Sequence, residues 1–421
     1  MNKKDFKKYM QQGLGRCALA LKSSTNIEKY KDVVLRGCLH DLSYDPQCEG
    51  TRADYVYHLT TYFKDEDYFL TPTLAAFEKI SRRSDWLFYH FCSLLRCFAE
   101  NSNAKALAAL EEKYQQLLSA LLSKRSFRGY DYERDNFERI CITLSSMGGR
   151  DILFKLSDGM GRLFKENPHY STQDFDWFCA VIARGMGEKR LSTLLERESK
   201  RSENIRIFYQ SYLKSKEAFQ STVRKPIIPP DAEDIKNEVA ECGKLSAASR
   251  VRFSHAPDEE KIKLAEQIIS EPHLDTKAEL LSAFAFRDEG FPLSHEIIIE
   301  YSKSSHERLR ETALEVLTSC KSTAVLSYAQ GLLSDEKYKT YAIEMLLCNY
   351  SPDIKELLLA ELYKLKIDYG DESDWHGVGS KILDVYDQNV KLPREFLLYI
   401  YETTLCSCCR EYAVRALAKH R

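Results

Sequence analysis

The chain has 421 residues, a formal net charge of −2, 44% hydrophobic residues and 29% charged residues. Its length exceeds the roughly 250–300 residues at which a single hydrophobic core stops growing, so we expect two domains or an extended stack of repeats. The composition excludes a disordered chain, and the near-neutral charge excludes a strong global field for nucleic acid or an anionic membrane.

Apolar residues in the first half of the chain recur at three- and four-residue steps, the spacing of one face of an α-helix. One stripe consists of Leu87, Phe91, Leu94, Leu95 and Phe98. A second consists of Leu107, Leu110, Tyr114, Leu117, Leu118 and Leu121. Because strand-like alternation is nearly absent, we expect an all-α fold.

Proline and glycine indicate where these helices begin and end. In Thr71-Pro72 the threonine is a plausible N-cap and the proline a first helical residue, since its missing N–H costs nothing there. Two Gly-Met-Gly elements, centred on Met160 and Met186, follow no expected strand, so we interpret them as turns rather than nucleotide-binding loops.

Acidic and aromatic residues stand together near several expected helix starts of the first half. A carboxylate in the first turn caps a helix and favours its dipole, which would leave the aromatic residues to the core. The alternative is that these residues line one polar groove together with nearby arginine. The candidate binding residues are Asp85, Trp86, Arg134, Asp135, Asp176 and Trp177.

The segment from Arg184 to Lys225 is the most basic part of the chain. It contains 11 arginines and lysines against five glutamates, a net charge of +6. Such a segment is ordinarily the solvated face of a long helix, but a nucleic acid or another phosphate-rich or acidic partner is the alternative.

The stretch from Arg224 to Asp231 has three prolines within five positions and cannot form a continuous helix. We expect a hinge there, followed by a helix that begins at Ala232 with Asp231 as its N-cap. This boundary divides the chain into an N-terminal helical-repeat region, residues 1–225, and a C-terminal repeat region, residues 226–421.

A helical unit recurs in the last third of the chain. Ala313 and Leu317 are followed 29 residues later by Ala342 and Leu346, each pair leading through a short turn into a second apolar helix. An Arg-x-x-Ala-x-x-x-Leu pattern begins at Arg310 and appears again at Arg410, Ala413 and Leu417. Self-similarity at such a period is typical of repeat architectures.

This pattern resembles the first helix of HEAT repeats, most specifically over residues 280–361. The resemblance implies an α-solenoid of stacked antiparallel helix pairs. The Asp-Trp pairs are also similar in residue type to the groove of HEAT-like alkylpurine DNA glycosylases, in which an aspartate and tryptophans hold a damaged nucleotide.

No motif for catalysis, metal binding or a cofactor stands out. The cluster Cys406-Ser407-Cys408-Cys409 has no second Cys/His pair beyond His420, so we expect no metal site. The 13 cysteines are odd in number and mostly set in apolar helical positions, which favours reduced thiols and a cytoplasmic location. No run approaches the ~20 apolar residues of a membrane helix.

The leading hypothesis is therefore a non-enzymatic helical-repeat scaffold without a cofactor, which binds a protein partner on its concave face. The alternative is a nucleic-acid-binding protein or a DNA glycosylase that uses the Asp/Trp/Arg groove. A steep fall of affinity with salt would indicate the alternative.

Overall fold

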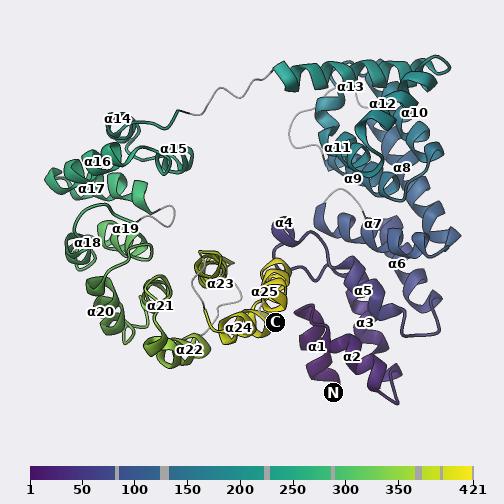
Figure 1. Ribbon diagram of the computed structural model, residues 1–421. Coiled ribbons are helices and arrows are strands. Elements are labelled where there is room, and N and C mark those ends of the chain that lie inside the picture. Colours follow the sequence, from purple (N-terminus) through teal and green to yellow (C-terminus); the bar gives the residue numbers. More distant parts are fainter. Residues whose placement is uncertain are drawn as a thin grey trace. The chain divides into compact units, whose positions relative to one another are not determined.

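A computed structural model describes residues 1–80, 85–123, 132–221, 228–285, 290–365, 372–388 and 392–419 (Figure 1). These residues form α-helices and short 3-10 turns with no strand among them, which confirms the all-α fold. None of the helices in these ranges combines the length and the apolar character that crossing a membrane requires. The chain divides into two compact units, one of Met1–Val223 with Leu405–Ser407 and one of Arg224–Thr404 with Cys408–Arg421.

The first unit consists of helices that pack on their neighbours in sequence, and α7, α9 and α11 also pack on one another in that order. Its helices are α1 (Lys3–Gln11), α2 (Arg16–Ser23), η1 (Glu28–Tyr30), α3 (Lys31–Leu39), α4 (Pro46–Glu49), α5 (Ala53–Thr60), α6 (Asp67–Lys79), α7 (Asp85–Glu100), α8 (Ala104–Ser123), α9 (Tyr132–Ser146), α10 (Arg150–Glu166), η2 (Thr172–Phe175), α11 (Asp176–Met186), α12 (Glu188–Ser199) and α13 (Glu203–Ser221).

The second unit is built in the same manner, and α17, α19, α21 and α23 form a chain of contacts through it. Its helices are α14 (Ala232–Cys242), α15 (Ala247–Phe253), α16 (Asp258–Ser270), α17 (Leu274–Leu281), η3 (Ser282–Phe284), α18 (His295–Tyr301), α19 (Glu307–Leu317), α20 (Thr323–Leu332), α21 (Lys339–Cys348), η4 (Pro352–Ile354), α22 (Lys355–Lys364), α23 (Glu372–Asp387), α24 (Arg394–Thr403) and α25 (Ser407–Lys419).

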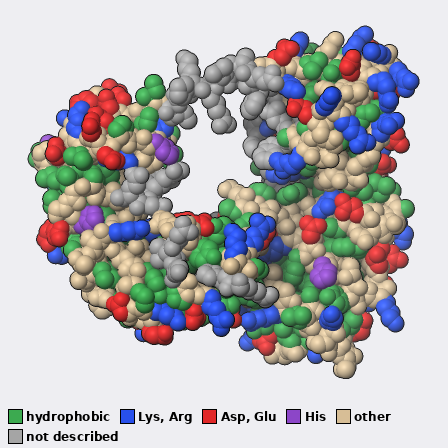
Figure 2. All heavy atoms as spheres, viewed as in Figure 1, with side chains coloured by type: hydrophobic (Ala, Val, Ile, Leu, Met, Phe, Trp, Pro, Cys, Tyr) green, Lys and Arg blue, Asp and Glu red, His purple; other side chains and the backbone are tan. Residues whose placement is uncertain are grey.

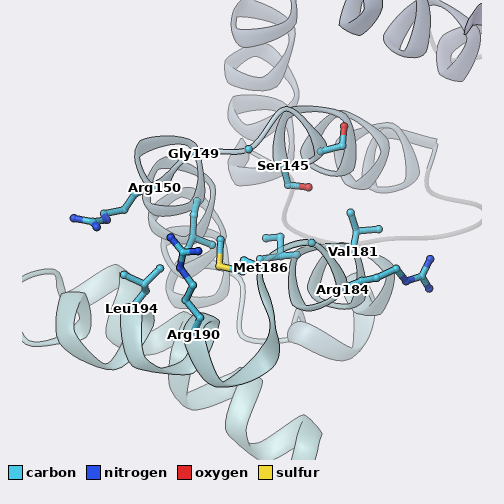
Figure 3. A pocket seen from close by; sticks show the side chains of 13 residues that line it. Ser145, Gly149, Arg150, Val181, Arg184, Met186, Arg190 and Leu194 are labelled. Atoms are coloured by element: carbon cyan, nitrogen blue, oxygen red, sulfur yellow. The ribbon is translucent and has the colours of Figure 1, made fainter. Parts of the chain in front are cut away.

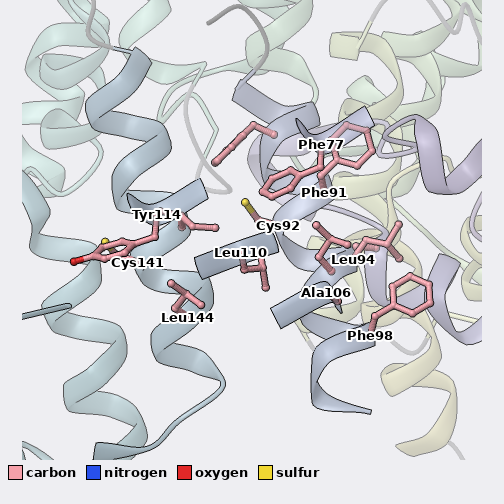
Figure 4. Packing of buried hydrophobic residues seen from close by; sticks show 14 of the residues in the cluster. Phe77, Phe91, Cys92, Leu94, Phe98, Ala106, Leu110, Tyr114, Cys141 and Leu144 are labelled. Atoms are coloured by element: carbon pink, nitrogen blue, oxygen red, sulfur yellow. The ribbon is translucent and has the colours of Figure 1, made fainter. Parts of the chain in front are cut away.

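A chain of aromatic rings runs through the core of the first unit. Tyr114 stacks on Phe137 with 5.5 Å between ring centroids, and Phe137 meets Phe175 edge-on at 5.8 Å. Phe175 in turn stacks on Phe164, which stacks on Phe208. Figure 4 shows the neighbouring part of this core, where side chains of α7 face those of α8 and α9. Because each ring belongs to a different element, the aromatic contacts tie α8, α9, α10, η2 and α13 together.

The recurring Arg-x-x-Ala-x-x-x-Leu pattern has the same local structure at both of its sites. Arg310 donates a hydrogen bond to the carbonyl of Ser304 at 2.9 Å, and Arg410 donates to the carbonyl of Thr404 at 2.8 Å. Each acceptor lies six residues earlier, in the turn before the helix. The alanine that follows, Ala313, is fully buried, so the pattern combines an anchored turn with a close helix contact.

Two expected helix starts have different outcomes. Asp231 caps α14 as predicted, with its carboxylate accepting from the Asp234 amide and the Asp234 side chain accepting from the Asp231 amide. The hinge residues 224–227 that precede it lie outside the described residues. At Thr71-Pro72 the prediction is wrong, because α6 begins at Asp67 and contains Pro72 in its interior. The fully buried Phe69 anchors that earlier turn in the core.

The interpretation of Gly159 and Gly161 as turn residues is also wrong. Both lie inside α10, at points where this helix packs closely on its neighbours. A Cβ at Gly159 would overlap the Tyr114 hydroxyl, and one at Gly161 would overlap the carbonyl oxygen of Asn204 at the start of α13. The missing side chains therefore permit close approach between helices, a role for which short sequence patterns give no signal.

Candidate ligand-binding pocket

A pocket of about 530 Å³ opens in the first unit where four helices end or begin (Figure 3). The ends of α9 and α11 and the starts of α10 and α12 surround it. Its lining residues are Ser145, Ser146, Gly148, Gly149, Arg150, Leu153, Val181, Ile182, Arg184, Gly185, Met186, Arg190 and Leu194.

Glycines form the two tight turns that border this pocket. Gly148 and Gly149 join α9 to α10 with φ angles of 80° and 101°, and Gly187 joins α11 to α12 with a φ of 85°. Residues with a side chain rarely adopt these angles, so glycine is required for turns this short. Gly149 is the N-cap residue of α10 and has no side chain. No N-cap side chain therefore accepts a hydrogen bond from the amide groups in the first turn of that helix.

The wall of the pocket is aliphatic. Leu153 of α10 and Ile182 of α11 belong to the buried core, with 2% and 6% of their surface exposed. Met186 and Leu194 are half-buried at the pocket and face solvent in part. Such a wall suits an apolar group, and the flexible methionine side chain adapts to its shape.

Three arginines surround this apolar wall, and no acidic residue lines it. In Figure 3 Arg190 reaches from α12 toward the start of α10, whereas Arg150 and Arg184 extend outward at the rim. All three are exposed, and within the described ranges no carboxylate lies within ion-pair distance of any of them. Guanidinium groups stay protonated at any physiological pH, so the pocket keeps a local positive charge that a bound anion would compensate.

The basic segment from Arg184 onward extends this charge over α12 and α13. Figure 2 shows lysine and arginine side chains gathered over the part of the first unit that Figure 1 labels α10, α12 and α13. Some of these cations pair with glutamates of their own surface, as Lys200 does with Glu196 at 4.0 Å. Lys189, Arg197 and Lys214 have no carboxylate within that distance among the residues described. Residues 222–225 of the segment lie outside the described residues.

The six residues predicted as a groove do not line this pocket. They belong to the first turns of α7, α9 and α11, while the pocket is formed by the last turns of α9 and α11. The start of α7 contacts the middle of α9, where the Arg139 guanidinium lies over the rings of Trp86 and Tyr89 at 5.6 and 4.6 Å. The Arg139 stacking partially buries the indole of Trp86.

Two further members of that predicted groove pair with each other. Arg134 and Asp135, adjacent in sequence, form an ion pair of 3.1 Å on half-buried side chains. The side chains of Asp85, Asp176 and Trp177 lie outside the described residues. The groove therefore stays a prediction. The pocket is not predicted from the sequence, although Gly185 belongs to a Gly-Met-Gly element and Arg184 and Arg190 to the basic segment.

Two titratable groups elsewhere in the first unit, Glu49 and His90, are buried in structural contacts. Glu49 forms a buried pair with Arg52 at 2.8 Å and also accepts from the amide groups of Tyr44 and Asp45. Burial raises the pKa of Glu49, but the Arg52 charge and the hydrogen bonds outweigh it, so that the pKa is lowered overall. Burial lowers the pKa of His90, whose Nε2 donates to the carbonyl of Cys38 at 3.3 Å.

The buried thiols are also poor candidates for chemistry. Burial raises the pKa of Cys17 and of Cys320 to about 11, which keeps both protonated and unreactive near neutral pH. Among the described residues, no group of three His, Cys, Asp or Glu side chains is placed to hold a metal ion.

No protein-family model and no curated protein sequence matches the chain.

Proposed function

We propose that this chain is a non-enzymatic, cytoplasmic scaffold of HEAT-like helix pairs that binds a protein partner through the pocket between α9, α10, α11 and α12. The observation that carries the proposal is a pocket of about 530 Å³ that combines an aliphatic wall with three arginines, none of which forms an ion pair with a described residue. An apolar side chain of a partner fits the wall, and an acidic group beside it fits the arginines. Tyrosine, tryptophan and arginine are the residues that most often dominate binding energy at protein interfaces, and the pocket supplies arginine.

The helix contacts support the scaffold half of this proposal. Next-but-one helices contact each other through both units, and the two arginines of the repeated pattern anchor the preceding turn identically. Repeat proteins present surfaces for partners without needing a catalytic site. A partner on the concave face of such a stack stays a prediction, and the pocket adds a defined contact at the helix ends.

A nucleic-acid partner is the second candidate, and the net charge of +6 between Arg184 and Lys225 favours it. The pocket itself argues against this candidate, because its lining contains no aromatic ring on which a base could stack. The Asp/Trp/Arg groove at the starts of α7, α9 and α11 would have to supply the stacking surface instead.

Affinity capture with matched variants tests the proposal. The full chain carrying Arg184→Gln and Arg190→Gln is compared with wild type and with Arg162→Gln, a control arginine on α10 that pairs with Glu166 outside the pocket. Quantitative mass spectrometry should show a protein that wild type and the control retain and the double variant loses. Purified partner should then bind with a shallow salt dependence.

Equal retention by all three proteins would refute a role for the pocket. A binding constant that falls by several orders of magnitude between 50 and 200 mM salt, together with co-purified nucleic acid, would support the second candidate instead.

A further inference from the structure

Arg190 of the pocket belongs to a longer stripe of residues on one side of α12. Arg190, Leu194 and Arg197 are spaced by four and three residues, which places them on the same face of the helix. Leu191 and Leu195 lie beside this stripe on the helix and are buried in the core. Leu194 lines the pocket, so the exposed stripe begins at the pocket and continues along the helix surface to Arg197.

The glutamates of α12 do not neutralise this stripe. Glu188 pairs with Lys216 of α13, and Glu198 pairs with Arg201 at 3.6 Å, while Glu196 faces Lys200. Across the ranges that the structure describes, no carboxylate is close enough to Arg190 or Arg197 to form an ion pair. Two exposed arginines therefore stand on one helix face, with their Cα atoms about 10 Å apart along the helix axis at 1.5 Å per residue.

This spacing matches a short piece of extended peptide. In the polyproline II form of an extended chain, the rise is about 3.1 Å per residue with three residues per turn, so side chains three residues apart point to the same side and are separated by about 9 Å. We infer that the partner contributes an extended acidic segment whose apolar side chain enters the pocket, with one anionic side chain on Arg190 and a second, three residues further on, on Arg197. The inference rests on the proposed function and names the kind of segment that the pocket reads.

Charge and shape both favour this occupant. A guanidinium binds a carboxylate or a phosphoryl group through two parallel hydrogen bonds, so aspartate, glutamate and phosphoserine share the required chemistry. The aliphatic wall next to Arg190 requires an apolar residue within the same segment, which distinguishes the motif from a purely acidic tail. Because both arginines are exposed, each pair contributes modestly, and selectivity arises from their fixed separation.

A positional peptide library measures the motif directly. Fluorescein-labelled nonapeptides carry leucine at the third position and either glutamate or serine at every other position, and binding to the full chain is followed by fluorescence polarisation. We expect glutamate to be preferred over serine at the position next to the leucine, and again at the position three residues beyond that glutamate. Arg197→Gln should remove the preference at the second position and lower the affinity of the best peptide by up to about five-fold. Peptides with serine at that second position should bind this variant and wild type about equally well.

Two controls separate the possible failures. Arg206→Gln on α13, an exposed arginine that faces Glu203, should leave both preferences intact. Phosphoserine at the second acidic position should bind at least as well as glutamate, and stronger preference for it would assign the natural ligand as a phosphorylated segment.

Loss of binding in Arg190→Gln without any positional preference in wild type would overturn the inference and leave the proposed function standing. If no library peptide binds wild type with a dissociation constant below about 1 mM, the inference fails, and the affinity capture decides the proposed function separately. Tighter binding of a twelve-nucleotide single-stranded DNA than of any peptide would replace the acidic segment by nucleic acid.

Discussion

Replacement of Gly161 by alanine tests the closest helix contact of the first unit. The added Cβ would overlap the Asn204 carbonyl oxygen and would lie 2.5 Å from its carbonyl carbon and 3.0 Å from its Cα. Since the obstacle is backbone, α10 and α13 must separate, and overpacking of this kind costs about 3 kcal/mol at the upper end. Alanine recovers about 1 kcal/mol through its higher helix propensity. We expect the free energy of unfolding of the first unit to fall by about 2 kcal/mol.

A loss of this size lowers the melting temperature of a unit of 150–250 residues by about 4–8 °C. Urea and thermal unfolding followed by tryptophan fluorescence report mainly on this unit, because Trp86 and Trp177 belong to it. Gly185→Ala is the matched control, since Gly185 is also helical and nothing lies within 4 Å of its added Cβ. An unfolding midpoint for Gly161→Ala that equals or exceeds those of wild type and the control would refute the close contact.

Three further predictions concern titratable groups. Glu49→Gln should lower the free energy of unfolding by about 3 kcal/mol at pH 7 because it breaks a buried ion pair. The pKa of Glu49 is lowered in the folded protein, so the stabilisation it provides is present above about pH 4.5 and is lost as the pH falls through the lowered value. Urea titrations should show the unfolding free energies of wild type and variant converging in that acidic range. A difference between them that does not change with pH would contradict this. The lowered pKa of His90 likewise means stability that is complete above about pH 6.5 and lost on acidification, so the advantage of wild type over His90→Gln should shrink from pH 7 to pH 5 by up to about 1.4 kcal/mol per pH unit. Among the cysteines whose side chains are described, the exposed Cys48, Cys242 and Cys408 should react quickly with DTNB at pH 8, and the total should reach 13 after denaturation. Rapid labelling of most thiols in the folded protein would contradict the burial of Cys17 and Cys320.

Local patterns predicted local structure well. The stripe that includes Phe91, Leu94 and Phe98 lies in α7 with those three side chains buried, because helical periodicity records which face meets the core. Asp231 as an N-cap depends only on residues within one turn of it, and the structure confirms it. Pro72 shows the limit of such reasoning, because burial of Phe69 decides where α6 begins and the sequence around Thr71 does not record that burial.

The pocket depends on contacts that a local pattern cannot reveal. Gly149 and Gly187 belong to turns 38 residues apart in sequence, and only the packing of α9 on α11 brings them to one place. Their positive φ angles are visible only in the folded backbone. Arg190 belongs to the basic segment that the sequence shows. Only the fold shows that Arg201 forms an ion pair with Glu198, whereas Arg190 forms none with a described residue.

The rim and the wall of the pocket have different roles, and this difference affects how the sequences of related chains would diverge. Arg150, Arg184 and Arg190 project from helix termini into solvent, whereas Leu153 and Ile182 hold the helices together. A charge at the rim can therefore be exchanged at little expense to folding. After duplication, we expect two descendants to acquire different partners through these rim positions while their helix framework stays the same.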